Sequence, residues 1–238
     1  MTLGAMSKPS THTLLRLAVL VLVSRALAGC AHGRMVVPKD IAAVSDEFVA
    51  VGRVSASGVL IDESFTLGPY GIEKIRHGVN WTLSSRPHGA VHADADGYAY
   101  QVQGNGVTVS GTCATNADPE ARLLFEEDLN PSEHRLHCVC RASDHAEPAR
   151  LSVATDYRPQ DLGEIQTSSG RYRLRSIFDR EEPFSSGLSP SGYRVDGDTP
   201  RGAVEVVMPG RAWFAHDLSE RDRTDIACLY AGLMLYRP

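Results

Sequence analysis

Residues 226–236 (IACLYAGLMLY) contain no charged side chain, and no polar stripe divides the apolar ones. A helix that is apolar on every side must be buried on every side. Eleven residues rise about 16 Å, which is too short to cross a bilayer. Ser219 can cap such a helix, with Asp222 three residues later in the position of a capping box. This stretch therefore predicts a helix that is enclosed by the rest of the protein.

Short apolar or alternating runs precede this helix, separated by Gly, Pro, Asn and Asp. Many such runs, without amphipathic helices between them, are typical of an antiparallel β-sandwich or barrel. The expected strands are residues 48–54, 64–67, 98–103, 107–113, 122–125, 134–141, 150–154, 171–178, 203–208 and 211–216. Residues 180–201 are rich in Gly and Pro and are expected to form a long mobile loop with a brief strand at 193–195.

A short, wholly apolar helix after so many strands suggests that it fills the lumen of a closed sheet. The expected fold is mainly β, an antiparallel closed barrel with a buried hydrophobic C-terminal helix. The alternative is a β-sandwich or a lipocalin-like barrel with the helix packed outside.

Strands that end in a buried hydrophobic helix resemble the tubby-like architecture, a twelve-stranded barrel around a central helix. Phospholipid scramblases and the plant LURP-one-related proteins share this architecture. The resemblance covers about residues 60–238 and rests on Gly170-Arg171-Tyr172, on residues 202–206 (GAVEV) and on the terminal helix. It implies the barrel fold and, since no signature residue is matched, no functional site.

The first thirty residues have the pattern of an export signal. Lys8 and Arg16 supply positive charge, residues 17–23 (LAVLVLV) form a short apolar run, and residues 27–30 (LAGC) close the segment. The run between Arg16 and Arg25 is too short for a spanning helix, so a cleaved signal is favoured over a permanent anchor.

Residues 27–30 resemble the lipobox of bacterial lipoproteins, whose cysteine is lipid-modified and becomes the first residue of the mature chain. The resemblance implies a diacylglycerol thioether on Cys30 and a protein that is lipid-anchored in the cell envelope. Ala31 after the cysteine favours the outer over the inner membrane. Arg25 departs from the family pattern, and the alternative is an ordinary secretory signal that leaves Cys30 as a plain thiol.

Three segments follow from this interpretation: a signal peptide at 1–29, a tether at 30–46 and a single β-rich domain at 47–238. The chain has 24 basic and 29 acidic side chains, a formal charge of −5. The signal contains three basic residues and no acid, so the mature chain has 21 basic and 29 acidic side chains and a net charge of −8. This acidic balance argues against a nucleic-acid partner and leaves the lipid as the expected attachment to the membrane.

Four cysteines besides Cys30 are candidates for disulfides, an even number suited to an oxidising compartment: Cys113, Cys138, Cys140 and Cys228. Cys138 and Cys140 lie two apart in an expected strand and point to the same face, where a bond between them would be strained. Cys113, at the end of the preceding strand, is the expected partner of one of them. Cys228 lies in the expected helix, where a free thiol and a bridge are equally expected.

Alternation in the strand at 171–178 places Arg171, Arg173 and Arg175 on one face. A row of guanidiniums offers paired donors to phosphate or carboxylate, so this face is a candidate site for an anionic lipid or glycan. The alternative is a solvated face whose charge is balanced by nearby acids: Asp179, Glu181 and Glu182.

The same alternation in the strand at 134–141 predicts a second set of side chains that face water or a negatively charged partner: Arg135, His137, Val139 and Arg141. His134, His137, Cys138 and Cys140 are all of metal-ligand type, but the strand period turns His137 away from the other three. Disulfides are therefore favoured over a metal, and no metal or cofactor is expected.

Neither a Gly-x-Ser-x-Gly elbow nor a His-Glu-x-x-His helix occurs in the chain, and Ser189 and Ser191 lie in the Gly- and Pro-rich loop without a group to activate them. The pattern favours a non-catalytic binding, structural or assembly role in the envelope, with another envelope protein or an anionic lipid as partner. The alternatives are a binder of anionic lipid or glycan through the arginine face, and a periplasmic hydrolase with no recognisable motif.

Overall fold

A computed structural model describes residues 33–53, 64–77, 97–115, 135–142, 147–154, 163–181 and 189–236. The chain divides into two units, residues 1–33 and residues 34–238. The helices and strands named below all lie in the second unit.

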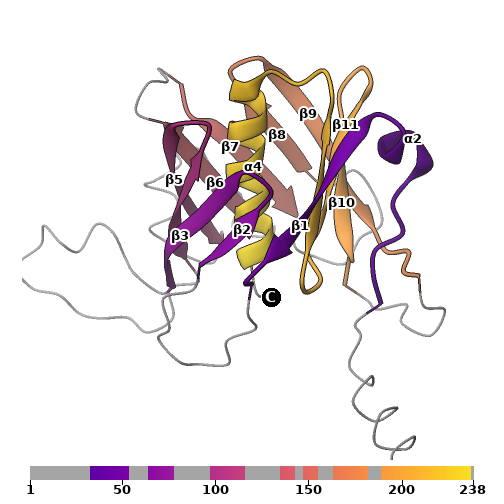
Figure 1. Cartoon of the computed structure of the whole chain (residues 1–238), viewed down its shortest axis with the longest axis horizontal. Helices are drawn as coiled ribbons and strands as arrows, with labels where there is room; N and C mark the ends of the chain where they lie inside the picture. Colours follow the sequence, from indigo (N-terminus) through magenta and orange to yellow (C-terminus); the bar gives the residue numbers. More distant parts are fainter. Residues whose placement is uncertain are drawn as a thin grey trace, which may run out of the picture. The chain divides into compact units, whose positions relative to one another are not determined.

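The described residues form a closed antiparallel barrel of twelve strands around one helix, α4 (Glu220–Leu235) (Figure 1). The strands are β1 (Ser45–Val51), β2 (Phe65–Leu67), β3 (Tyr70–His77), β4 (Tyr98–Gly104), β5 (Val107–Thr115), β6 (Arg135–Ala142), β7 (Ala149–Ala154), β8 (Gly163–Thr167), β9 (Gly170–Ile177), β10 (Gly192–Asp196), β11 (Pro200–Glu205) and β12 (Arg211–Ala215). Each strand pairs with its neighbours in the sequence, and β1 pairs with β12 to close the sheet. The expected closed barrel is confirmed, and the alternatives with an external helix are excluded.

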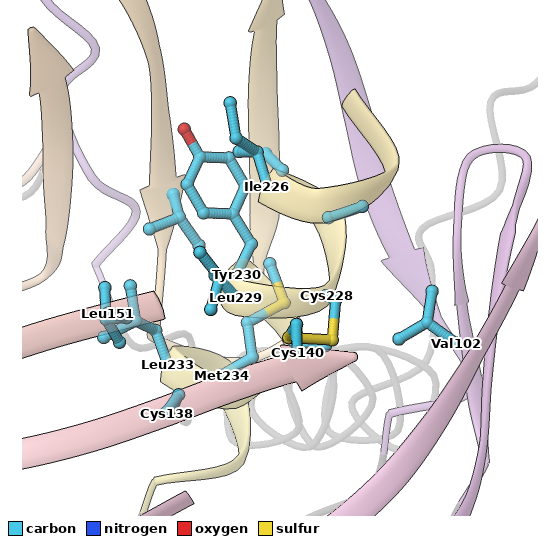
Figure 2. Packing of buried hydrophobic residues seen from close by; sticks show 14 of the residues in the cluster. Val102, Cys138, Cys140, Leu151, Ile226, Cys228, Leu229, Tyr230, Leu233 and Met234 are labelled. Atoms are coloured by element: carbon cyan, nitrogen blue, oxygen red, sulfur yellow. A yellow bond between two sulfur atoms is a disulfide. The ribbon is translucent and has the colours of Figure 1, made fainter. Parts of the chain in front are cut away.

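Helix α4 lies inside the barrel, and all of its residues from Thr224 to Leu235 are buried. Figure 2 shows its apolar side chains, among them Ile226, Leu229 and Leu233, packed between the surrounding strands. The cap at Ser219 is confirmed, because its Oγ accepts a hydrogen bond from the N–H of Asp222 at 3.1 Å. No helix among the described residues has both the length and the apolar character needed to cross a membrane.

Two tyrosines of β4 hold the helix to the wall of the barrel. Tyr98 donates its hydroxyl to the carbonyl of Gly232 at 2.7 Å, and Tyr100 donates to the carbonyl of Cys228 at 2.8 Å. The ring of Tyr100 covers Gly111 on β5, where a Cβ would lie 2.3 Å from the ring. A glycine is required there because any side chain would displace the tyrosine that contacts the helix.

Two disulfides lie in this interior, and together they use all four cysteines after Cys30. Cys113 and Cys138 face each other on the neighbouring strands β5 and β6 and form the first bond. Cys140 on β6 joins Cys228 on α4 in the second, which Figure 2 shows. The expectation that Cys138 and Cys140 bind other partners is confirmed, as is Cys113 as the partner of one of them. The question left open for Cys228 is answered by a bridge that ties the helix to the wall.

The strand predictions were incomplete at β3 and β8, which the sequence pattern did not indicate. In β3 a bulge between Glu73 and Arg76, with Lys74 at a φ of 53°, interrupts the two-residue period. Strand β8 is short and has polar residues at alternate positions. The brief strand expected at 193–195 is confirmed as β10, which is one residue longer at each end and pairs with both of its neighbours in the barrel. The strand expected at 122–125 lies outside the described residues.

The segment expected to be a tether is, from Arg34 onward, part of the barrel unit. Residues 34–44, which we call the strap, lie on the outer side of the barrel and contain the one-turn helix α2 (Lys39–Ala42) (Figure 1). Met35 and Ile41 are fully buried in an outer apolar cluster with Trp213. Strand β12 is therefore buried on both faces, by α4 inside and by the strap outside.

An ion pair beneath the strap fixes its first residues. Arg211 donates from Nε to Glu205 at 2.6 Å and from Nη2 to the carbonyl of Met35 at 2.9 Å. Glu205 also accepts the backbone N–H of Met35. Glu205 and Arg211 are 2% and 7% exposed, so the two charges are buried together and the backbone of the strap completes their hydrogen bonds.

The expectation that four side chains of β6 face water was wrong for His137 and Val139, which are 4% and 5% exposed. Arg135 donates to Ser152, the residue paired with His137 on β7, and so its side chain lies beside the imidazole. Burial, together with the charge of Arg135, lowers the pKa of His137 to about 4. Val139 is flanked in the sheet by Thr112 on β5 and Arg150 on β7, and both of these side chains are half-buried.

Candidate functional site

A hollow of about 480 Å³ opens on the outer surface of the barrel, over β9 and the turn between β10 and β11. We call it the arginine hollow, and its charged lining residues are Arg171, Arg173, Arg175, Arg201, Asp196 and Asp198. The three arginines that the sequence placed on one face of a strand are thus brought together here. Arg201 and the two aspartates were missed.

The period of β9 positions the arginine side chains. Tyr172 and Leu174 are buried in the interior, so Arg171, Arg173 and Arg175 point outward and are exposed. The arginines at alternate positions lie about 7 Å apart along the strand. The turn between β10 and β11 brings Arg201 to the same hollow from another part of the chain.

The guanidiniums of the hollow differ in how firmly they are held. Arg201 has a close partner outside the lining, Asp217, at 2.7 Å. Arg171 and Arg175 have long contacts, 3.7 Å to Glu164 and 3.9 Å to Asp196. Contacts of this length between exposed groups contribute little free energy.

Arg173, at the centre of the row, makes no hydrogen bond or ion pair with any residue that the structure describes. Glu164 on β8 and Asp196 on β10 are its register neighbours. Neither carboxylate lies within ion-pair distance of its guanidinium. The central donor of the row is therefore available to a ligand.

Asp196 does little to neutralise the row of arginines, because both oxygens of its carboxylate already accept hydrogen bonds from Arg194. Arg194 donates from Nε and Nη2 to the two oxygens of Asp196, at 2.7 and 2.6 Å. Its Nη2 also donates to Asp40 of the strap at 2.9 Å. Burial opposes ionisation of Asp40, but Arg194 outweighs it and holds the pKa of that carboxyl below its usual value.

The acids expected to balance the arginines do not lie in the hollow. Asp179 and Glu181 follow the opposite end of β9, where the carboxylate of Glu181 lies 4.0 Å from Arg211. Glu182 lies outside the described residues. The lining has four arginines against two aspartates, one of them bound by Arg194. Glu164 and Asp217, the partners of Arg171 and Arg201, lie just outside this lining, so the excess of positive charge is confined to the lining residues themselves.

The chemistry of this arrangement suits the binding of an anion. Guanidiniums remain charged at every physiological pH and offer paired N–H donors that match the oxygens of phosphate or carboxylate. Ser191, one of the serines considered for hydrolysis, is buried, and its hydroxyl donates to the carbonyl of Ile177 at 2.8 Å. The hydroxyl of Ser191 is therefore engaged in a hydrogen bond to the backbone of β9.

The remaining candidate site residues are the potential metal ligands at 134–140 and the candidate lipidation site, Cys30. Cys138 and Cys140 are both in disulfides, so neither offers a thiolate to a metal. Among the described residues, no group of three or more His, Cys, Asp or Glu side chains is placed to hold a metal ion. Cys30 and His134 lie outside the described residues.

Arg201 could have been found only with the strand pairing in hand. It lies 26 residues beyond Arg175 in the sequence, in a stretch expected to be a loop. Pairing of β9 with β10 and of β10 with β11 brings it to the hollow. No local sequence pattern marks such a contribution.

Comparisons of this chain with protein-family models, with curated proteins and with solved structures found no match.

Proposed function

We propose that this protein is a lipid-anchored cell-envelope protein whose role is non-catalytic binding of an anionic group in the arginine hollow. The observation that carries the binding role is the row of three outward arginines in which the central one, Arg173, has no partner among the described residues. Phosphate and carboxylate are the ligand chemistries that such a row suits.

Two features support binding on the outer surface over binding inside the barrel. Helix α4 occupies the lumen, and residues on all of its sides are buried, from Ile226 to Ala231 without any exposure. A ligand in the lumen would have to replace that helix, which a disulfide and two tyrosine hydroxyls hold in place.

The anchoring half of the proposal rests on residues 27–30 (LAGC) and on the disulfides. Pairing of all four remaining cysteines fits an oxidising compartment outside the cytoplasm. A thioether-linked lipid on Cys30 would attach the domain to the membrane stably, since two or more acyl chains suffice for this. We propose the outer membrane as its location.

Metabolic labelling with an alkyne fatty acid tests the anchor. The wild-type chain and Cys30→Ser are labelled in parallel, and both are separated into membrane and soluble fractions. We expect label and membrane association to be lost together in Cys30→Ser. An unlabelled wild-type chain in the soluble fraction would overturn the anchor.

Titration with inorganic phosphate and with glycerol phosphate, followed by NMR of the arginine Nε–H groups, tests the hollow. We expect saturable shifts in the parent and at least tenfold weaker binding in Arg171→Ala/Arg173→Ala. Arg141→Ala, which removes an exposed arginine from β6 three strands away from β9, is the matched control and should bind as the parent does. Equal binding by all three chains would contradict the proposed site.

A further inference from the structure

The strap and the arginine hollow lie on the same outer face of the barrel. Met35 crosses the first residue of β10, since a Cβ on Gly192 would lie 2.3 Å from the Met35 sulfur. Asp196, the last residue of β10, lines the hollow. Asp196 is the fourth residue after Gly192 along the strand, a distance of about 13 Å.

The strap also contacts the edge of the hollow directly. Arg194 of β10 bonds Asp40 of the strap and Asp196 of the hollow through one guanidinium. The backbone of residues 34–36 pairs with the chain that follows β9, through Val36 N–H to Asp179 O at 3.0 Å and Glu181 N–H to Arg34 O at 2.8 Å. The strap is therefore fixed to β10 and to the chain that follows β9, the strand that carries three of the four arginines of the hollow.

The chain between Cys30 and the pinned residue Met35 is short. Met35 is the fifth residue after Cys30, and five steps of fully extended chain span at most about 18 Å. Acyl chains on Cys30 would therefore keep the face formed by β9 and β10 close to the headgroups of the bilayer. The residues from Met35 onward are fixed to the barrel, so they cannot act as a flexible tether that would let the domain leave the membrane surface.

We infer that the ligand of the arginine hollow is the phosphate of an anionic phospholipid in the same bilayer that holds the lipid anchor. This inference rests on the proposed function and adds the source of the anion. Attachment then has two parts, the acyl chains of Cys30 and the guanidiniums of Arg171, Arg173 and Arg175. A basic patch beside a lipid chain strengthens membrane attachment and also sets which face of the protein meets the lipid.

Vesicle flotation with the full chain carrying Cys30→Ser tests the inference, because this chain lacks the atom that accepts the lipid. The vesicles are pure phosphatidylcholine, or phosphatidylcholine with 30% phosphatidylglycerol as the anionic lipid. Binding to the neutral vesicles measures any contribution of the apolar segment at residues 17–23, which every variant shares.

We expect Cys30→Ser to float with the anionic vesicles and to lose that binding as salt rises from 0.05 to 0.5 M. Adding Arg171→Glu and Arg173→Glu should weaken binding by about tenfold or more. Arg141→Glu on β6 reverses the charge at one exposed site elsewhere on the barrel, half the change of net charge, and should weaken binding less than twofold. Thermal unfolding of each variant confirms that the barrel is intact.

The outcomes separate this inference from the proposed function. Hollow variants that float as well as the parent, or an equal loss in Arg141→Glu, overturn the lipid source. Arginine-dependent binding of soluble glycerol phosphate without binding to anionic vesicles also overturns the lipid source, while the anion-binding function stands. Loss of both kinds of binding from the parent chain overturns the two together.

Discussion

The interior of the barrel and the outer face over β9 and β10 use charge in opposite ways. Inside, the apolar part of the helix contacts an apolar wall, and the links between them include two tyrosine hydrogen bonds and one disulfide. Outside, arginines and carboxylates are closely spaced, yet Arg173 in the middle of the row has no partner among the described residues.

Because of this difference, we expect one set of residues to stabilise the fold and another set to bind the ligand. Contacts of the interior are buried, so their loss should cost folding free energy. Contacts of the hollow are long or exposed, so their loss should cost little stability. Substitutions in the two regions can therefore test whether the division holds.

The largest loss of stability is expected on removing the bond between wall and helix. Cys140→Ala/Cys228→Ala opens a link between residues 88 positions apart. The chain-entropy model gives about 4–5 kcal/mol for a loop of this length, to be measured by urea unfolding. Cys113→Ala/Cys138→Ala is the comparison, with a separation of 25 residues and an expected loss of about 3–4 kcal/mol. A greater loss of stability in Cys113→Ala/Cys138→Ala than in Cys140→Ala/Cys228→Ala would contradict this prediction.

The next effect is expected under the strap. Arg211→Met leaves the buried carboxylate of Glu205 without its cation, which should cost about 3 kcal/mol in urea unfolding. The strap should also loosen, because Arg211 no longer holds the carbonyl of Met35. Faster tryptic cleavage after Lys39 would report this.

Glu205→Gln/Arg211→Met is the control, since it removes both charges. It should regain part of the stability but leave the strap susceptible to trypsin. Resistance to trypsin equal to that of the parent in Arg211→Met would show that apolar packing of Met35 and Ile41 alone fixes the strap.

A smaller effect, with a defined pH window, is expected at His137. Its pKa is about 4 in the folded barrel and near 6.5 in the unfolded chain, because burial disfavours the imidazolium. Between these values the unfolded chain binds the proton and the folded one does not, so stability falls as the pH drops from 6.5 to 4.

The expected loss across this window is on the order of 2 kcal/mol. Urea unfolding of the parent and of His137→Gln at pH 7.5 and pH 4.5 measures it. The parent should lose that much more than the variant over the same interval. Parallel pH profiles would mean that His137 is protonated in the folded state.

The smallest change in stability is expected in the hollow itself. Arg173→Ala removes a side chain with no ion pair among the described residues, so unfolding free energy should change by less than about 0.5 kcal/mol. Anion binding by the same variant should fall markedly. A large loss of stability without a change in binding would assign Arg173 to the fold and remove the distinction between the two regions.

The enclosed helix could be predicted because eleven uncharged residues leave it no face for water, and the two-residue period of β9 revealed its arginines. Strand β3 escaped prediction because a bulge shifts its buried residues, Ile72 and Ile75, to a spacing of three. Arg201 and the strap escaped for another reason. Their positions depend on pairing between distant segments, which leaves no periodic trace in the sequence.

The place of α4 in the chain has a consequence for how the protein is made. The helix follows all twelve strands, and β12, which closes the sheet against β1, directly precedes it. A growing chain thus presents the apolar lining of the barrel before the segment that covers it has been synthesised. Such surfaces attract other unfolded chains, so we expect the nascent chain to be prone to aggregation until synthesis is complete. Any interruption of translation before α4 should yield an aggregating product instead of a smaller folded one.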